Sequence, residues 1–380
     1  MSDVLALAQS LIRCESVTPK EAGTLDVLEN MLKPLGFVCS RHAFHRPETA
    51  PVENLFAKWG SGAPHFCFAG HVDVVPVGDA SAWTHPPFGA DIVDGILYGR
   101  GASDMKTGVA AFVTAAEKFI CTAPPKGSIS LLITCDEEGP SVNGTEPLLK
   151  LLHEKGERFE ACLVGEPTSA GQFGDTVKIG RRGSLHGYLT ILGKQGHVAY
   201  PDRADNPVPR LLRTLSALKE KVLDEGNGDF QPSNLEITTV DIGNPAANVI
   251  PAKAFARFNV RFNTEHTGES LSQKLREICS RHAGAHELRF ETGAEPFLTS
   301  PGPLSTSVTR AIQAVTGHAP ALSTAGGTSD ARFISRYCPV TEFGLLNHTA
   351  HHVDEHVAVA DVLALEKVYH RILEEFFGAG

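Results

Sequence analysis

The chain has 380 residues, 42% of them hydrophobic, with a formal net charge of -10 and an isoelectric point near 5.9. That length suffices for two domains or for one domain with a large insertion, and the acidic balance argues against non-specific binding to nucleic acid. No apolar stretch approaches the roughly 20 residues that a membrane helix needs, so we expect no membrane partner.

The N-terminal stretch, residues 3–12, has apolar residues at helical spacing and lacks the basic leader and cleavage site of a signal peptide. The eight cysteines are scattered along the chain and form no C-x-x-C pattern. We interpret them as reduced thiols, which predicts a cytoplasmic protein.

The first half of the chain alternates helical and strand-like patterns. Short apolar runs bounded by Gly, Pro or charge predict buried strands at residues 54–60, 65–70, 128–135 and 159–165. Helical spacing predicts helices at residues 3–12, 24–36, 106–120 and 145–155. This alternation predicts an α/β fold with a mixed, largely parallel sheet covered by helices.

The pattern changes after Gly180. The predicted elements are then a strand, a helix, two strands, a helix and a strand, at residues 184–193, 206–223, 234–243, 255–263, 270–284 and 286–293. This β-α-β-β-α-β order is that of a ferredoxin-like α+β unit. After this unit, the pattern again alternates helices and strands as in the first half. It predicts helices at residues 306–317 and 360–377 and a strand at residues 339–346. We therefore expect a catalytic domain in two parts, residues 1–181 and 295–380, interrupted by an inserted domain at residues 182–294.

Acidic and histidine side chains follow many of the predicted α/β strands. In chain order they are His71, Asp73, Asp104 (before a helix), Glu137, Glu138, Glu166, His351 and His352. Because the carboxyl ends of parallel strands meet at one edge of a sheet, we expect these side chains to lie close together. So many acids could not all stay ionised without a cation, and two metal ions about 3.5–4 Å apart account for them better than one. Histidine and carboxylate ligands favour zinc or cobalt over magnesium or calcium.

Each residue alone has a simpler interpretation. Asp104 alone would more often cap a helix, His71 would be a core histidine, and the pair His351-His352 would belong to a solvated loop. Their coincidence at one sheet edge favours the metal site. The i, i+2 spacing of His71 and Asp73 further predicts a carboxylate that orients a ligand histidine.

Five stretches, GHVDVVPVGDASAW, GRGASDMKTGVAA, TCDEEGP, LVGEPT and AHHVDE, resemble motifs of the di-zinc aminoacylase/carboxypeptidase family. The resemblance runs from the first residues to the last helix. It implies a metal-dependent hydrolase of linear amides with two zinc ions per subunit, cobalt being possible in one or both sites. It also implies a homodimer in which the inserted domain is the lid and dimerisation domain.

The resemblance assigns roles at the matched positions. Asp104 would bridge the metals, His71 and Glu166 would complete one site, and Glu138 and His351 the other, with His352 as the alternative to His351. Glu137 would be the general acid/base for a metal-bridging hydroxide, with Asp73 supporting His71. His197 would stabilise the oxyanion, from the other subunit of the dimer.

Further stretches, among them KIGRRGSLHGYLTILGKQGHVAYP, NPAANVIPA, FNVRFN and AGGTSDARF, resemble a subfamily whose small-molecule substrate carries several carboxylates. Arg181 and Arg261 are the candidates to pair with those carboxylates. Neutral donors are expected from Ser184, Tyr200, Asn248 and Thr328, and backbone N–H groups from the turn at Gly327.

Other functions fit less well. An acetylornithine deacetylase or a carboxypeptidase of the same family would share the metal centre and differ only in the pocket. A metal-binding regulatory protein would not need Glu137. Nucleotide binding at Gly99-Arg100-Gly101 lacks the third glycine, and a cysteine hydrolase built on Cys135 is disfavoured because Cys135 lies in an apolar strand.

Overall fold

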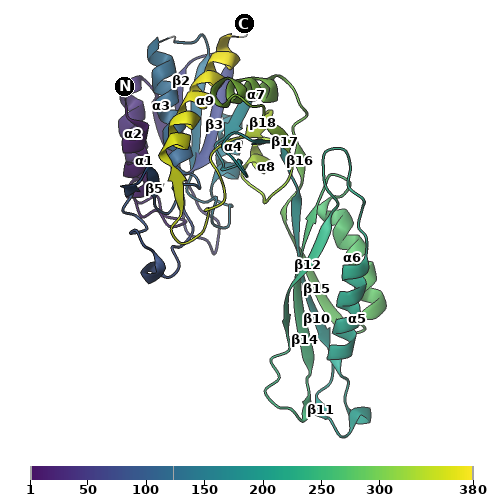
Figure 1. Cartoon of the computed structure of the whole chain (residues 1–380). Coiled ribbons are helices and arrows are strands. Elements are labelled where there is room, and N and C mark those ends of the chain that lie inside the picture. The colour runs from purple at the N-terminus through teal and green to yellow at the C-terminus, as the bar shows by residue number, and fades with distance from the viewer. Residues whose placement is uncertain (1, 123, 379–380) are drawn as a thin grey trace. The chain divides into compact units, whose positions relative to one another are not determined.

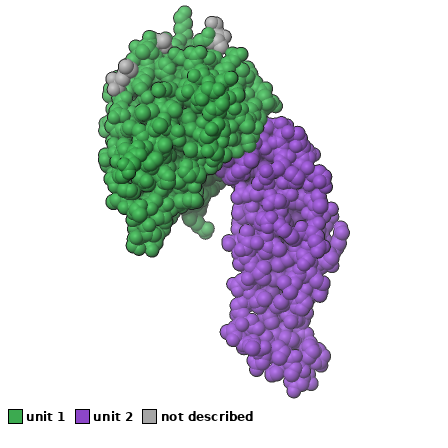
Figure 2. All heavy atoms as spheres, viewed as in Figure 1, with its two compact units in different colours: residues 1–179, 299–323, 329–380 green, residues 180–298, 324–328 purple. Residues whose placement is uncertain are grey.

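The computed structural model describes residues 2–122 and 124–378, whose contacts form two compact units (Figure 2). Unit 1 comprises residues 1–179, 299–323 and 329–380, and unit 2 comprises residues 180–298 and 324–328. Residues 324–328, expected in the second part of the catalytic domain, cluster with unit 2, where Arg181 Nη1 donates to the carbonyl oxygen of Gly327 at 3.0 Å.

An eight-stranded sheet forms the middle of unit 1, in the order β1-β2-β6-β3-β7-β18-β8-β17 (Figure 1). The parallel strands β6 (Ser128–Thr134), β3 (His65–His71), β7 (Ala161–Val164) and β18 (Val340–Glu342) are neighbours at its centre. One edge is antiparallel and consists of β1 (Val38–Phe44) and β2 (Val52–Gly60); the other consists of β8 (Thr176–Lys178) and β17 (Ala321–Ser323). The predicted mixed, largely parallel sheet is confirmed.

Helices cover this sheet, so that every residue of β3 and of β6 is buried. Phe66 and Phe68 of β3 stack on Phe112, with ring centroids 6.2 and 4.2 Å apart, and Tyr369 meets Phe68 edge-on at 5.7 Å. These rings pack α3 and α9 against the sheet. The helices of unit 1 are α1 (Val4–Ile12), α2 (Thr24–Leu32), α3 (Lys106–Thr122), α4 (Thr145–Glu154), α7 (Pro303–Thr316), α8 (Ala331–Ile334) and α9 (Val359–Gly378).

A small three-stranded sheet brings the last part of the chain next to the segment before α3. It has the order β19-β5-β4 and consists of β4 (Ile92–Val93), β5 (Ile96–Tyr98) and β19 (His356–Ala358). Because β19 pairs antiparallel with β5, the loop before β19 lies beside the loop that follows β5.

Unit 2 has the predicted β-α-β-β-α-β order. Its elements are β10 (Gly183–Leu192), α5 (Pro207–Glu220), β12 (Asn234–Asp241), β14 (Lys253–Phe262), α6 (Gly268–His282) and β15 (His286–Ala294). The strands form an antiparallel sheet in the order β12-β14-β10-β15, and both helices lie on one face of it (Figure 1). Alternate residues of β10, such as Leu185, Leu189 and Ile191, are buried in the core with Phe258 of β14.

Two pairs of short strands complete unit 2. β9 (Gly180–Arg181) pairs with β16 (Phe297–Leu298), and β11 (Gly196–His197) pairs with β13 (Val249–Ile250). None of the helices in the described part of the chain is both long and apolar enough to cross a membrane.

Candidate metal centre and active site

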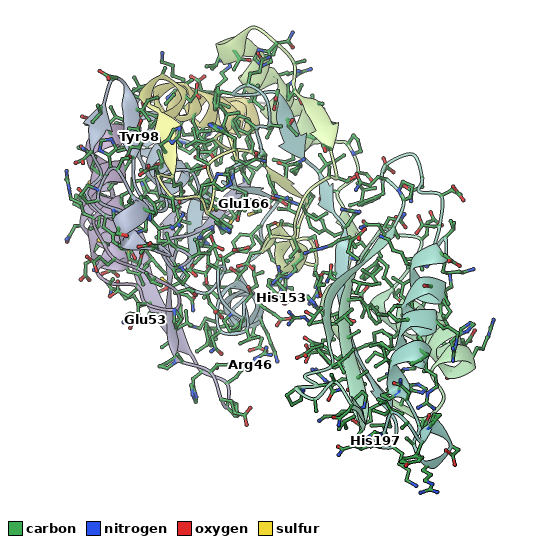
Figure 3. The ribbon with its side chains drawn as sticks, turned by 60° about the horizontal axis from the view of Figure 1, so that its bottom comes forward. Arg46, Glu53, Tyr98, His153, Glu166 and His197 are labelled. Carbon is green, nitrogen blue, oxygen red and sulfur yellow. The ribbon has the colours of Figure 1, made fainter. Side chains whose placement is uncertain are left out.

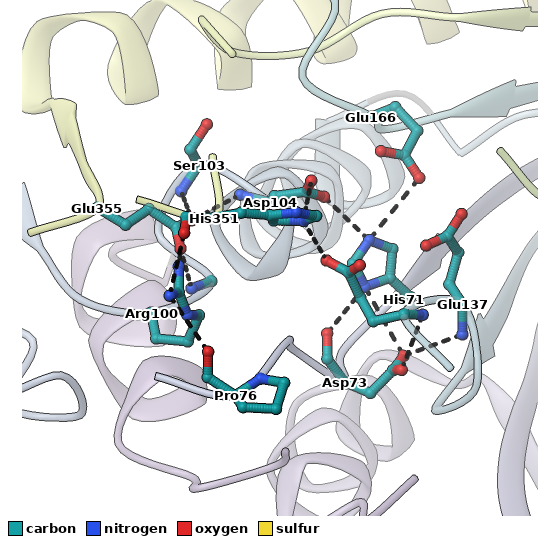
Figure 4. Close-up of polar contacts among 12 residues, drawn as sticks. His71, Asp73, Pro76, Arg100, Ser103, Asp104, Glu137, Glu166, His351 and Glu355 are labelled. Carbon is teal, nitrogen blue, oxygen red and sulfur yellow. Dashed lines mark hydrogen bonds and ion pairs between the residues drawn. The ribbon is translucent and has the colours of Figure 1, made fainter. Parts of the chain in front are cut away.

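The candidate ligands of unit 1 lie just beyond the carboxyl ends of three neighbouring parallel strands. His71 is the last residue of β3, Glu138 lies four residues beyond β6, and Glu166 lies two residues beyond β7. Asp104 precedes α3, and His351 lies on the loop before β19. Segments far apart in the sequence therefore meet at this edge of the sheet (Figure 4).

Short contacts link the five side chains. His71 Nε2 lies 3.0 Å from Asp104 Oδ1 and 3.7 Å from Glu166 Oε1. His351 Nε2 lies 2.8 Å from Glu138 Oε1 and 3.4 Å from Asp104 Oδ2. Asp104 thus offers one oxygen to each histidine and belongs to both of two groups. We call them the His71 group (His71, Asp104, Glu166) and the His351 group (His351, Asp104, Glu138).

The donor atoms of these groups fit a pair of metal ions. Two ligands of a tetrahedral zinc ion, each about 2.05 Å from it, lie about 3.3 Å apart. The four separations above, 2.8, 3.0, 3.4 and 3.7 Å, bracket that value. Imidazole and carboxylate donors without thiolates are a set that suits zinc and cobalt. The cluster is also compact across the two groups, because donor atoms of His71, Asp104 and Glu138 all lie within 4.8 Å of one another.

The carboxylates are crowded and largely removed from water. Burial raises the pKa of Glu166 well above its usual range, and the nearby charges of Asp104 and Glu137 raise it further. Burial likewise raises the pKa of Glu137 well above normal, with Asp330 and Glu138 adding to the effect. Such groups repel one another when they are ionised, and a divalent cation among them would relieve that repulsion.

Asp73 supports the cluster through both its backbone and its side chain. His71 Nδ1 donates to the main-chain oxygen of Asp73 at 2.9 Å, while the Asp73 carboxylate lies 3.7 Å from the same nitrogen. That carboxylate accepts the backbone N–H groups of Glu137 at 3.3 Å and Glu138 at 3.1 Å. Asp73 therefore contacts the adjacent glutamates as well as the histidine that it was expected to orient.

The three adjacent acids of the loop after β6, Asp136, Glu137 and Glu138, make different contacts. Glu138 points to His351, whereas Glu137 belongs to neither group and lies beside Glu166. Asp136 is buried, and its Oδ2 accepts the N–H groups of Val142 and Asn143, both at 2.8 Å. Asp136 therefore folds the loop on which the two glutamates lie.

The structure distinguishes between the two adjacent histidines of the C-terminal motif. His351 contacts both Glu138 and Asp104, and its backbone adopts a left-handed φ of 64°. His352 is exposed, and its backbone N–H donates to the carbonyl of Thr349.

The substrate-binding candidates all lie in unit 2, where they form two groups. Arg181 and Gly327 meet at the hydrogen bond described above, and Ser184 is the register partner of Arg261 across β10 and β14. Thr328 follows Gly327 in the same loop. Gly326 adopts a φ of 104°, and a Cβ there would come within 3.0 Å of Arg181 Nη1, so this turn requires glycine.

The second group lies at the other end of β10. His197 and Tyr200 have ring centroids 5.7 Å apart, and the carbonyl of Asn248 accepts the N–H of Val198. The side chains of His197, Tyr200 and Asn248 are exposed, and Figure 3 shows His197 at one end of unit 2. Since β10 rises about 3.3 Å per residue, the eight steps from Ser184 to Leu192 alone separate the two groups by about 26 Å.

Sequence reasoning missed a buried ion pair beside the cluster. Arg100 Nη1 lies 2.7 Å from Glu355 Oε2, and both side chains are almost fully buried. Asp330, which is buried near Glu137, was also missed. The sequence did offer a signal for the ion pair. Arg100 and Glu355 are charged residues in two stretches that the sequence analysis had already named, Gly99-Arg100-Gly101 and AHHVDE.

The structure disfavours two of the alternative functions, the cysteine hydrolase and the nucleotide-binding protein. Cys135 is fully buried, and burial raises the pKa of its thiol well above normal, which disfavours a nucleophile. In the Gly99-Arg100-Gly101 turn, the N–H of Gly101 donates to the Glu355 carboxylate at 3.0 Å. The carboxylate therefore takes the place that the phosphate of a nucleotide would need.

Comparison with known proteins finds a family match over most of the chain. Residues 67–375 match the model described as peptidase family M20/M25/M40. A succinyl-diaminopimelate desuccinylase from Rhodospirillum centenum is 56% identical over 376 residues, covering 99% of this chain and 97% of the relative. One from Parvibaculum lavamentivorans is 55% identical, covering 99% and 96%.

Solved structures share the fold at much lower sequence identity. An M20 family metallo-carboxypeptidase from Sulfolobus solfataricus superimposes with a TM-score of 0.82 at 17% identity, covering 100% of both chains. A dinuclear metal-binding peptidase of the M20 family from Bacillus subtilis gives 0.71 at 15% identity, covering 97% of this chain and 96% of the other.

Proposed function

This chain belongs to the peptidase family M20/M25/M40, and we propose that it hydrolyses N-succinyl-LL-2,6-diaminopimelate to succinate and LL-2,6-diaminopimelate. The observation that carries the proposal is that relatives more than half identical to it along nearly their whole length are succinyl-diaminopimelate desuccinylases. The reaction would serve the synthesis of lysine and of cell-wall precursors in the bacterial cytoplasm.

The His71 and His351 groups are the proposed holders of two metal ions, zinc or cobalt, with Asp104 shared between them. When bound, such ions supply Lewis acidity that activates water and polarises the amide carbonyl. The separations of the donor atoms and the crowding of buried carboxylates support this assignment.

Glu137 is the proposed general acid/base. Its carboxylate lies within the cluster but belongs to neither ligand group, so it remains available for proton transfer. A carboxylate in this place can accept the proton of the attacking water and then deliver it to the leaving amine. The carboxylate of Asp73 would hold Glu137 in place through the backbone N–H.

The first group of unit 2 residues would bind the carboxylates of the substrate. Arg181 and Arg261 offer guanidinium groups that pair with carboxylates in two-point contacts, and Ser184 and Thr328 offer hydroxyls. Burial lowers the pKa of Arg261, yet a guanidinium keeps its charge at neutral pH. An acidic substrate would offer carboxylates to both guanidinium groups.

The second group, His197, Tyr200 and Asn248, would act in a homodimer. The length of β10 keeps this group about 26 Å or more from the first, which exceeds the reach of one small substrate. We therefore assign His197 to the oxyanion of a substrate bound by the other subunit, with Tyr200 and Asn248 beside it.

The test is the hydrolysis of N-succinyl-LL-2,6-diaminopimelate by metal-loaded protein, compared with that of N-acetylornithine under the same conditions. We expect kcat/KM to be much larger for the succinylated substrate. Preference for N-acetylornithine would overturn the assigned substrate, and inactivity on both substrates with two metals bound would overturn the assigned reaction.

A further inference from the structure

A buried pair of opposite charges connects the two segments that carry Asp104 and His351. Glu355 is 0% exposed and Arg100 2% exposed, and Arg100 Nη1 lies 2.7 Å from Glu355 Oε2 (Figure 4). A buried carboxylate is tolerated only when it is paired and hydrogen-bonded, so the contacts that this pair makes indicate what it stabilises.

The Glu355 carboxylate binds the backbone that leads into Asp104. Its Oε1 accepts the N–H of Ser103 at 2.8 Å and that of Asp104 at 3.0 Å. Its Oε2 accepts the N–H of Gly101 at 3.0 Å, besides the contact with Arg100. Four donors thus surround one carboxylate, and three of them belong to the loop that orients Asp104.

The Arg100 guanidinium binds the loop that carries His351. Nη1 donates to the carbonyl oxygen of His352 at 3.2 Å, and Nη2 lies 3.4 Å from the carbonyl oxygen of His351. The guanidinium also lies over the ring of Trp83, 5.1 Å from its centroid, which limits its movement. Arg100 therefore holds the backbone at His351, which adopts the left-handed φ of 64°.

Each member of the pair comes from one segment and binds the other. Arg100 precedes Asp104 by four residues and contacts the His351 loop, whereas Glu355 follows His351 by four residues and contacts the Asp104 loop. Ser103 adds a third tie, because its Oγ donates to the carbonyl of Leu346 at 2.7 Å. The spacing between the two segments is thus held by reciprocal side-chain contacts in addition to the pairing of β19 with β5.

We propose that Arg100 and Glu355 form a positioning pair that sets the distance between Asp104 and His351 and so governs binding of the metal in the His351 group. The inference rests on the proposed function, because it assumes that the two groups hold metals. The His351 group spans both segments, whereas the His71 group uses only the Asp104 segment. Loss of the pair should therefore weaken one metal site more than the other.

The test follows binding of Co²⁺ to the full-length metal-free protein by calorimetry and by visible absorption, without substrate. In Glu355→Gln, one of the two binding steps should lose about 10- to 100-fold in affinity, as expected for groups that orient metal ligands. The other step should change much less, and added metal should restore turnover. Glu366→Gln is the matched control. Glu366 is also buried and pairs with Lys118 at 2.6 Å, but this ion pair joins α9 to α3 and contacts neither of the two loops.

Equal weakening of both steps, or no change in either, would overturn the proposal. If Glu355→Gln does not fold, Arg100→Lys decides in the same way, because lysine keeps the charge but lacks the planar fork that contacts Glu355 and the His351 loop together. Wild-type protein that binds only one Co²⁺ would also overturn the inference. Wild-type protein that binds two but does not cleave the succinylated substrate would instead contradict the proposed function alone.

Discussion

Among single residues, Glu137 and Glu138 show how adjacent side chains come to different tasks. Glu138 contacts His351 at 2.8 Å, and Glu137 lies among Glu166 and His71 instead. Their backbone N–H groups share one acceptor, the carboxylate of Asp73. A single buried residue therefore fixes both a candidate ligand and the candidate base.

Arg181 and Arg182 give a matched test of substrate recognition. Arg181→Lys should raise KM for the succinylated substrate about tenfold, equivalent to ~1.4 kcal/mol, because lysine cannot pair with a carboxylate at two points. Arg182→Lys should change KM less, because Arg182 Nη1 donates to Asn234 Oδ1 of β12 at 2.8 Å, outside the candidate group, whereas Arg181 Nη1 donates to Gly327 within it. The measurement is KM from steady-state kinetics of both variants. An equal rise in KM in the two variants would contradict the placing of Arg181 in the substrate pocket.

The residue types of the cluster were predictable, whereas the contacts around it were not. His71, Glu138 and Glu166 follow apolar runs, so their sheet edge could be inferred from the chain. The pairing of Arg100 with Glu355 joins residues 255 positions apart, and no local pattern encodes it. The roles assigned to the cluster from the sequence remain predictions.

Among elements, the loop after β6 has the most direct effect on the site. Asp136 holds this loop closed through the N–H groups of Val142 and Asn143. A comparable carboxylate, Asp175, accepts the N–H groups of Ala170 and Gly171 at 2.9 and 2.7 Å in a turn that begins four residues beyond Glu166, after the bridge between Ser169 and Leu346.

Asp136→Ala should lower stability by about 1–3 kcal/mol and kcat by about tenfold or more, because unsatisfied donors loosen the loop that carries Glu137. Asp175→Ala should lower stability while leaving kcat close to that of the wild type. Thermal unfolding and turnover measured on both variants make the comparison. Unchanged kcat in folded Asp136→Ala would show that the loop is held by other contacts.

Buried elements were predicted well and edge strands were missed. α3 and β6 carry continuous apolar patterns and lie where the sequence placed them. β1 was not predicted, because its residues are half-buried or exposed, with Val38 75% exposed, and no apolar run marks it. β17 has three residues, and its pairing with β8 rather than its own composition makes it a strand.

For the whole molecule, the metals should contribute to the stability of unit 1 alone, because all the candidate ligands lie there. A site filled at 100 times its Kd stabilises the folded state by about 2.7 kcal/mol. Both tryptophans, Trp59 and Trp83, belong to unit 1, so their fluorescence reports its unfolding separately.

Removal of metal with a chelator should lower the midpoint of thermal unfolding followed by tryptophan fluorescence, and added zinc should restore it. Circular dichroism would follow both units, and the part of its transition that belongs to unit 2 should not shift. A midpoint that is the same with and without chelator would mean that the cluster binds no metal tightly.

The most direct measurement is the rate of succinate release from N-succinyl-LL-2,6-diaminopimelate as zinc is added stepwise to metal-free protein, with Glu137→Gln run beside the wild type. Release by the wild type should begin with added zinc and reach its maximum when two ions are bound. Glu137→Gln should bind the same zinc and release almost no succinate. Full activity in metal-free protein, or substantial release by Glu137→Gln, would contradict a metal-dependent desuccinylase in which Glu137 transfers the proton.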